Sequence, residues 1–174
     1  ALTESEKAAI RSCDFTLREK AFVELLYSTG IRRGEALALT RNDINFATNE
    51  ISINKSLAFI NYNQPEIKTT KTKNSNRVIP MPKALAQTLK SYLTSINTIY
   101  LFTRQNGEPM SEGSYKRMWQ AIYSKINFRL GGNDTIKATD LTVHIFRHNY
   151  ATMLFYQGID VKQAQLLLGH SNIK

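Results

Sequence analysis

The sequence predicts an α+β fold that is mainly helical, with one small antiparallel sheet of about three strands between helices. Segments at both ends of the chain combine helix start signals with apolar residues at helical spacing. Alternating residues in the middle of the chain, interrupted by a polar turn, are typical of short strands. There are no repeats or low-complexity tracts, and the length of 174 residues suits one domain.

The first forty residues are expected to form three helices. "LTESEKAAI" carries a capping box, with Thr3 as N-cap and Glu6 three positions later. "LREKAFVELLYSTG" has apolar residues at helical spacing, and Gly30 suits its C-terminal stop. "RRGEALALT" predicts a short third helix that Leu37 and Leu39 anchor in the core.

The next forty residues are expected to form the sheet. "NDINFATNE" is typical of a turn, and "ISINKSLAFI" alternates well enough to predict one strand. "EIKTTKTKNSNRVIPMP" predicts a strand, a polar turn at residues 74–76, and a short strand that ends at Pro80. These segments together predict about three antiparallel strands.

The second half of the chain is expected to be helical again. "PKALAQTLKSYLTSI" and "EGSYKRMWQAIYSKINF" predict helices, joined by a connector with an Asn-Gly turn at 106–107. After the loop "RLGGNDTIKATD", a helix is expected from about Val143 to Tyr156. A last helix, "DVKQAQLLL", is predicted to be N-capped by Asp160, with Gln163 three positions later.

The charge balance favours an anionic partner. Lys plus Arg number 23 against 14 Asp plus Glu, a net charge of +9. Nucleic acid is the commonest such partner, a membrane surface or RNA is an alternative, and a merely basic soluble protein stays open. The single cysteine, Cys13, excludes an internal disulfide framework and a Cys-rich zinc site. No apolar run is long enough to cross a membrane and no signal peptide starts the chain, so a cytoplasmic location is expected.

The pentapeptide HIFRH opens an otherwise apolar helix with three basic side chains. His144, Arg147 and His148 share a sector about 100° wide. Cations there oppose the helix dipole, and no acid occurs between Asp140 and Asp160 to pair with them. An external anion such as phosphate would resolve this conflict. The alternative is a core histidine bonded to a carbonyl and an arginine paired with a distant acid.

Two further basic positions adjoin helix ends. Arg32 and Arg33 begin the short third helix, with Glu35 close enough to orient one of them. The alternative is that both arginines are simply solvated. His170 follows Gly169 at the end of the last helix, where a histidine is often purely stabilising.

A lysine-rich segment is expected at a hairpin tip. Such a hairpin can lie along a nucleic-acid backbone or insert a lysine into a site, but lysines also protect edge strands from aggregation. Its basic residues are Lys68, Lys71, Lys73 and Arg77.

These clusters, in this order, resemble the catalytic domain of the tyrosine recombinases, and most of all the integrases of phages and conjugative transposons. The likeness covers nearly the whole chain in four blocks. The first block is matched by Thr29, Gly30, Ile31, Arg32, Glu35 and Asp43. The second, R-x-[IV]-P after a hairpin lysine, is matched by residues 77–80. The third, H-x-x-R-H followed by A-T, is matched by His144, Arg147, His148, Ala151 and Thr152, and the fourth, L-G-H-S, by residues 168–171.

The resemblance implies DNA cleavage by phosphoryl transfer. In this family a tyrosine attacks the scissile phosphate, forms a 3′-phosphotyrosine link and releases a 5′-hydroxyl, with no metal and no cofactor. The resemblance implies that Arg32 and Arg147 clamp the non-bridging oxygens. It implies that His144 exchanges a proton with the nucleophile and that His170 donates a hydrogen bond to the phosphate.

The remaining roles also follow from the resemblance. A hairpin lysine protonates the leaving 5′-oxygen, for which Lys71 is expected, with Lys73 as the alternative. The residues expected to contact DNA are Lys68, Lys73, Arg77 and Arg33. The residues expected to support the site are Glu35 and Asp43, which orient Arg32 and its helix, and His148. The expected partner is double-stranded DNA at attachment or recombination sites, bound by a homotetramer inside a bacterial cell or the host of a phage or mobile element.

Two departures from the family pattern shape the expected activity. The family's tyrosine lies about nine residues beyond the L-G-H histidine, a position expected to fall after Lys174. Tyr150 and Tyr156 are expected to face away from His144 and Arg147 and so not to replace it. The family's N-terminal DNA-clamping domain is expected to be missing before the first block. Residues 1–174 are therefore expected to be a single catalytic domain that is a monomer when free, binds DNA and does not cut it alone, whereas the homotetramer on DNA is expected of the full-length protein. A non-catalytic DNA-binding regulator is the alternative, and a basic RNA-binding protein or metal-free nuclease is a third.

Overall fold

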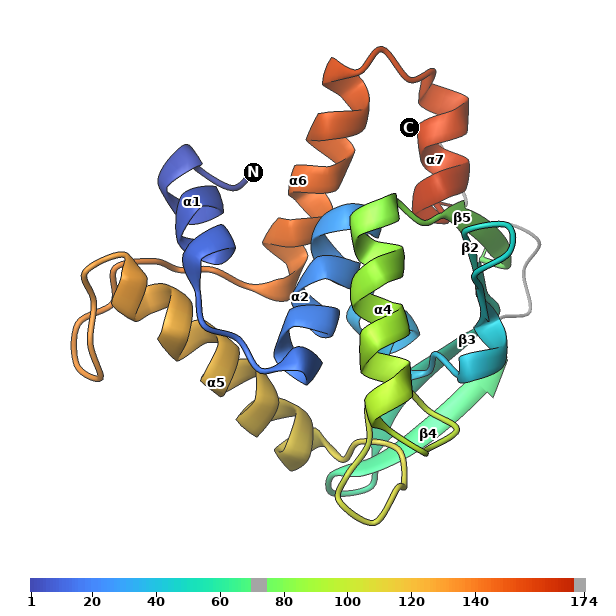
Figure 1. Cartoon of the computed structure of the whole chain (residues 1–174), viewed down its shortest axis with the longest axis horizontal. Coiled ribbons are helices and arrows are strands. Elements are labelled where there is room, and N and C mark those ends of the chain that lie inside the picture. The colour runs from blue at the N-terminus through green and yellow to red at the C-terminus, as the bar shows by residue number, and fades with distance from the viewer. Residues whose placement is uncertain (70–74, 171–174) are drawn as a thin grey trace.

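The computed structural model describes residues 1–69 and 75–170, and within them the mainly helical α+β class is confirmed (Figure 1). The helices are α1 (Glu4–Ser12), α2 (Leu17–Thr29), α3 (Arg33–Leu37), the 3-10 helix η1 (Arg41–Asp43), α4 (Lys83–Ser95), α5 (Glu112–Arg129), α6 (Val143–Tyr156) and α7 (Val161–Leu168). The strands are β1 (Ile44–Asn45), β2 (Glu50–Ile53), β3 (Lys55–Ile60), β4 (Gln64–Thr69) and β5 (Arg77–Pro80).

Helix α2 is the central element of the core. It buries side chains around most of its circumference, and it packs against α4 and α6, between which it lies in Figure 1. Phe22 of α2 meets Phe102 edge to face, with ring centroids 5.2 Å apart. Because α2 is packed on several sides, its C-terminal end fixes the position of the turn at Gly30 and of the residues that follow it.

Local end signals predicted the helix boundaries well. The capping box of α1 is confirmed, since Thr3 Oγ1 accepts from the Glu6 N–H at 3.1 Å and Glu6 accepts from the Thr3 N–H at 2.9 Å. Gly30 ends α2 with φ +62°, as its position predicted. Asp160 does precede α7, but its side chain makes no capping hydrogen bond, so this N-cap prediction was right in position only.

The strands form two sheets instead of one. The order of the first sheet is β1-β2-β5, and β3 pairs only with β4. The expectation of a single strand at 51–60 is wrong, because Asn54 separates two strands, β2 and β3. The hairpin turn lies at residues 61–63, where Asn61, Tyr62 and Asn63 all have positive φ, and was not expected. The polar turn predicted at 74–76 falls partly outside the described residues.

Helices α6 and α7 form a helical hairpin that projects from the rest of the domain (Figure 1). Tyr150, Leu154 and Leu168 form a small separate apolar cluster between them. Helix α6 is largely apolar in sequence but is not buried along its whole length, because Phe155 and Tyr156 at its end are largely exposed. Among the described helices, none combines the length and apolar character that spanning a membrane requires.

Candidate active site

The C-terminal ends of two helices hold Arg147 in place. It lies in the second turn of α6, and its guanidinium donates to the carbonyl of Gly30 at 2.7 Å and to that of Leu168 at 2.5 Å. These carbonyls stand at the C-terminal ends of α2 and α7, where the helix dipoles are negative. The side chain is buried, and within residues 1–69 and 75–170 it has no carboxylate partner, which the distant-ion-pair alternative had required.

Burial and the neighbouring arginines disfavour the charged form of Arg147. Its pKa is lowered to about 10, chiefly by burial and also by the charges of Arg32 and Arg77, which Glu35 partly offsets. At neutral pH the guanidinium is still charged. A buried cation without a full counter-charge gains from binding an anion.

Arg32 and His144 face the same pocket as Arg147. Arg32 is the N-cap of α3, two residues after the left-handed Gly30 turns the chain out of α2. His144 lies exposed in the first turn of α6. The pocket has a volume of about 470 Å³, and its lining residues are Ile31, Arg32, Arg33, Tyr115, Trp119, Thr142, Val143, His144 and Arg147. The lining holds three arginines and no acid, which favours the anion-binding interpretation of HIFRH.

His170 joins this group from α7. It follows Gly169, whose φ of +72° ends the helix and whose carbonyl accepts from Arg32 Nη2 at 3.4 Å. Partial burial lowers the pKa of His170, and the charges of Arg147, Arg32 and Arg77 lower it further. The ring is therefore neutral near pH 7, with one N–H free to donate and one nitrogen free to accept.

Arg77 lies in a different environment from the one expected of a DNA contact. Its guanidinium makes a bidentate ion pair with Glu35, at 2.7 and 3.0 Å, and its Nε donates to the carbonyl of Leu167 at 2.8 Å. Only 6% of the side chain is exposed. The expectation that Arg77 contacts DNA is corrected, because every part of its fork is already bonded inside the protein.

The two acids expected to support Arg32 serve different elements. Glu35 accepts the backbone N–H of Arg32 at 3.0 Å, but its carboxylate bonds chiefly to Arg77. Asp43 accepts from Thr40 and forms a 2.6 Å ion pair with Lys55, so it ties η1 to β3 and does not touch Arg32. Strand β3 in turn packs against α3. Asp43 therefore supports the helix of Arg32 indirectly.

The remaining expected residues are spread out. Arg33 lies over the rings of Phe59 and Tyr115, 5.4 and 5.1 Å from their centroids, and borders the pocket. Lys68 is exposed on β4, and His148 is exposed on α6 without lining the pocket. Lys71 and Lys73 lie outside the described residues.

The tyrosines near the pocket are structural. Tyr150 is buried and contacts the turn at Gly30, while Tyr156 is exposed at the far end of α6, and neither belongs to the pocket lining given above. Tyr115, which sequence reasoning missed, forms one wall with Trp119. Burial raises the pKa of Tyr115 to about 12, so its hydroxyl stays protonated.

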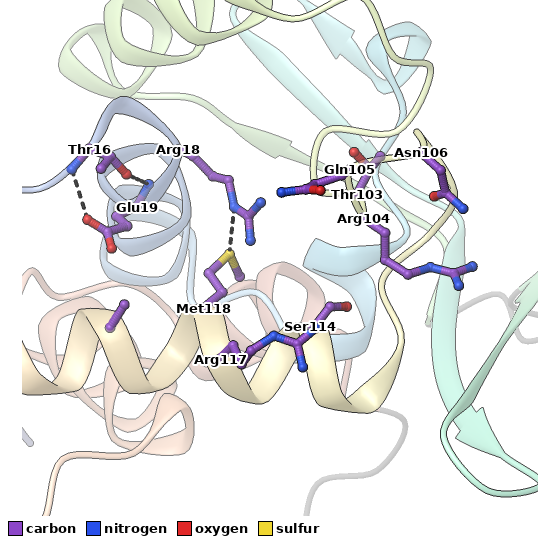
Figure 2. Close-up of a pocket in the computed structure, with 11 residues that line it drawn as sticks. Thr16, Arg18, Glu19, Thr103, Arg104, Gln105, Asn106, Ser114, Arg117 and Met118 are labelled. Atoms are coloured by element: carbon purple, nitrogen blue, oxygen red, sulfur yellow. Dashed lines mark hydrogen bonds between the residues drawn. The ribbon is translucent and has the colours of Figure 1, made fainter.

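A second basic concavity, of about 790 Å³, lies on the other flank of α5. Figure 2 shows Arg18 reaching from α2 to Met118 and Arg117 beside it on α5, with the loop of Arg104 forming the opposite wall. None of the three arginines makes a salt bridge to another residue in the described parts of the chain. These arginines are far apart in sequence and belong to no motif, so the sequence did not predict that they lie together.

Comparison with known proteins identifies the family to which the chain belongs. Residues 2–174 match the model of the phage integrase family. The chain is 28% identical to the tyrosine recombinase XerD of Halalkalibacterium halodurans, covering 91% of this chain and 48% of that protein. It is 30% identical to XerA of Pyrococcus horikoshii, covering 99% and 53%. The chain thus spans about half the length of the curated relatives that it matches.

Solved structures share the fold. The Tn1549 transposon integrase in complex with circular intermediate DNA superposes with a TM-score of 0.81 at 24% identity, covering 98% of this chain and 59% of that one. The crystal structure of XerA recombinase superposes with a TM-score of 0.72 at 25% identity, covering 98% and 56%.

Proposed function

Because this chain belongs to the phage integrase family, we propose that it supplies the phosphate-binding and proton-transfer groups of a tyrosine recombinase, which cuts and rejoins double-stranded DNA at specific sites. One observation carries the proposal. Arg32, His144 and Arg147, which are distant in sequence, line one pocket without an acid, and His170 stands beside them. A basic protein that only needed charge would not require this arrangement.

The proposed reaction is a transfer of a phosphoryl group from DNA to a tyrosine and back. The tyrosine oxygen bonds to phosphorus, the bond from phosphorus to the 5′-oxygen breaks, and that oxygen leaves with a proton. Attack by a second strand's 5′-hydroxyl reverses these changes. Negative charge grows on the non-bridging oxygens in the transition state, and the guanidinium groups of Arg32 and Arg147 would bind these oxygens.

The histidines and a lysine would move the protons. His144 lies at the exposed rim of the pocket, where it can take the proton of the attacking hydroxyl. His170, neutral because its pKa is lowered, can donate a hydrogen bond to the phosphate without adding a fourth positive charge. Lys71 is proposed to protonate the leaving 5′-oxygen, with Lys73 as the alternative.

The DNA would extend past the pocket onto neighbouring basic surface. The second concavity offers Arg18, Arg104 and Arg117, which make no salt bridge in the described parts of the chain; Arg33 borders the first pocket, and Lys68 lies exposed on β4. Each phosphate contact releases a counterion, so binding falls steeply with salt. Replacing Arg117 with Ala should reduce the slope of log K against log salt by about 0.9, and an unchanged slope would exclude this contact.

The catalytic proposal is tested in a protein that includes the expected tyrosine position, about nine residues after His170. A nicked recombination-site duplex would trap the covalent protein–DNA link, which a denaturing gel detects. Arg147→Ala should abolish the link while duplex binding stays largely intact. Arg11→Ala, which removes an exposed arginine of α1, is the matched control and should leave both unchanged.

Two outcomes would count against the catalytic proposal. If the unmodified protein binds the duplex but never forms the link, the regulator alternative is favoured. If Arg147→Ala weakens binding and linking to the same extent, Arg147 is only a binding cation.

We further propose four protomers on DNA, a monomer for residues 1–174 alone, and a cytoplasmic location. Relatives in solved structures are bound to DNA, which supports the DNA partner. Light scattering of the chain with and without its duplex measures the number of protomers.

A further inference from the structure

The last turn of α7 accepts hydrogen bonds from three arginines in succession. The carbonyl of Leu167 accepts from Arg77 Nε at 2.8 Å, and that of Leu168 accepts from Arg147 Nη2 at 2.5 Å. The carbonyl of Gly169 accepts from Arg32 Nη2 at 3.4 Å. The end of α7 is thus the place where the three cations meet, and its unpaired carbonyls and dipole stabilise them.

Arg77 differs from Arg32 and Arg147 in its place relative to the pocket. It does not line the pocket, and it packs so closely under α7 that a Cβ on Gly169 would lie 2.6 Å from its Nη1. It also bonds both oxygens of Glu35. Arg77 therefore ties β5 to α3 on one side and to α7 on the other.

Glu35 has a second cation within reach. Its Oε2 lies 2.7 Å from Arg77 Nη1 and 3.7 Å from Arg32 Nη1, and its side chain is only 2% exposed. A buried carboxylate that loses its partner must find another cation or take up a proton. Without Arg77, the nearest cation to Glu35 is Arg32.

We infer that Arg77 is a positioning residue: it saturates Glu35, which leaves the Arg32 guanidinium free for phosphate, and it fixes the turn of α7 that carries His170. This inference rests on the proposed function, in which Arg32 and His170 contact the phosphate. It assigns to the R-x-[IV]-P block a task distinct from that of the hairpin lysine before it. The fork of arginine suits the task, because one lysine nitrogen does not bond Glu35 and the Leu167 carbonyl with the same geometry.

The test uses this chain with inorganic phosphate as the probe. NMR of the arginine Nε–H groups follows phosphate binding at Arg32 and Arg147, and NMR of the three histidine rings gives the pKa of His170. The variants are Arg77→Met, Arg77→Lys and the double variant Arg77→Met/Glu35→Gln. Arg11→Met is the matched control for loss of one arginine, and circular dichroism checks that each variant folds.

Arg77→Met should weaken phosphate binding by about tenfold or more, the factor expected when a charge-assisted hydrogen bond is lost. The pKa of His170 should rise toward 6.5, because one nearby positive charge is gone and the turn is released. The double variant should regain phosphate binding at Arg32, since a glutamine does not attract the guanidinium, while the His170 shift persists. Arg77→Lys should show both effects to a smaller extent.

Several results would overturn the inference. A folded Arg77→Met with normal phosphate affinity and an unchanged pKa of His170 would exclude it. A double variant no better than the single one would exclude competition by Glu35. If Arg77→Met does not fold, unchanged values in Arg77→Lys decide against it. If the unmodified chain fails to bind phosphate, the proposed pocket is wrong, while the His170 pKa and the Arg32 resonance still report on positioning by Arg77.

Discussion

Replacing Gly30 with alanine strains the turn on which the pocket is built. Gly30 has a φ of +62°, and an added Cβ would lie 2.5 Å from Tyr150 Cδ1 and 2.9 Å from Cγ. These atoms belong to a buried ring, so the ring has to move. The Gly30 carbonyl also accepts from Arg147, so the substitution disturbs the stability of the fold and the position of Arg147 together.

The expected cost has two parts. A left-handed conformation costs an L-residue about 1–2 kcal/mol. Displacing a packed ring costs about 1–3 kcal/mol more. The free energy of unfolding should therefore fall by about 2–5 kcal/mol, a large share of the roughly 5–15 kcal/mol of an ordinary domain.

Gly158→Ala is a matched control for the backbone part. Gly158 has a φ of +74°, yet no atom lies within 4 Å of where its Cβ would be. Its substitution should cost only about 1–2 kcal/mol. Introducing Gly30→Ala in a Tyr150→Ala background should cost less than in the unmodified chain, because the ring is absent and only the Cβ at position 150, 3.0 Å away, stays close.

Urea unfolding followed by circular dichroism measures these differences. With a slope of about 2 kcal/mol per molar, the midpoint for Gly30→Ala should drop by roughly 1–2.5 M. Equal costs at Gly30 and Gly158, or a coupling between Gly30 and Tyr150 below about 0.5 kcal/mol, would refute the steric reasoning.

Three further predictions concern stability. Lys55→Met should cost about 3 kcal/mol, because it leaves the buried carboxylate of Asp43 without its cation; the double variant with Asp43→Asn should recover much of this in urea unfolding. Burial alone would raise the pKa of Glu35, but the hydrogen bonds and charge of Arg77 outweigh it and lower the pKa below 4.5. The stabilisation from Glu35 is therefore present above pH 4.5 and is lost as the pH falls through the lower pKa of the folded state. Glu35→Gln should lose less stability than the unmodified chain between pH 5 and pH 3, which urea midpoints across that range measure. Thr3→Ala should lower the free energy of unfolding by about 1 kcal/mol through loss of the α1 cap, and a change below a few tenths would mean that this end is frayed.

Local signals account for most of what could be predicted about the fold. Helix α6 spans Val143–Tyr156 as expected, and Thr3 and Gly30 act at the ends assigned to them. A cap or a left-handed stop depends on atoms within four residues of each other, so the sequence contains the whole interaction. The split of the sheet at Asn54 was missed, because strand pairing depends on partners far along the chain.

The chemical identity of the site was also readable from the sequence. The blocks around Arg32, Arg147 and His170 predicted a phosphate site; the structure places Arg32 and Arg147 in one pocket with His170 close to their charges, and phosphate binding there stays a prediction. Each cluster alone left a structural alternative open, and only the order of the four blocks, through the family resemblance, grouped these residues into one predicted site.

The tertiary structure alone decided which basic residues are free to bind. Arg77 looked like a surface cation beside lysines, yet its partner Glu35 lies 42 positions away and buries it. Arg18, Arg104 and Arg117 carried no motif, yet folding gathers them around one concavity. Sequence determines which groups can carry charge and where helices begin and end. Whether a charge is neutralised or left open depends on distances across the fold, which only packing sets.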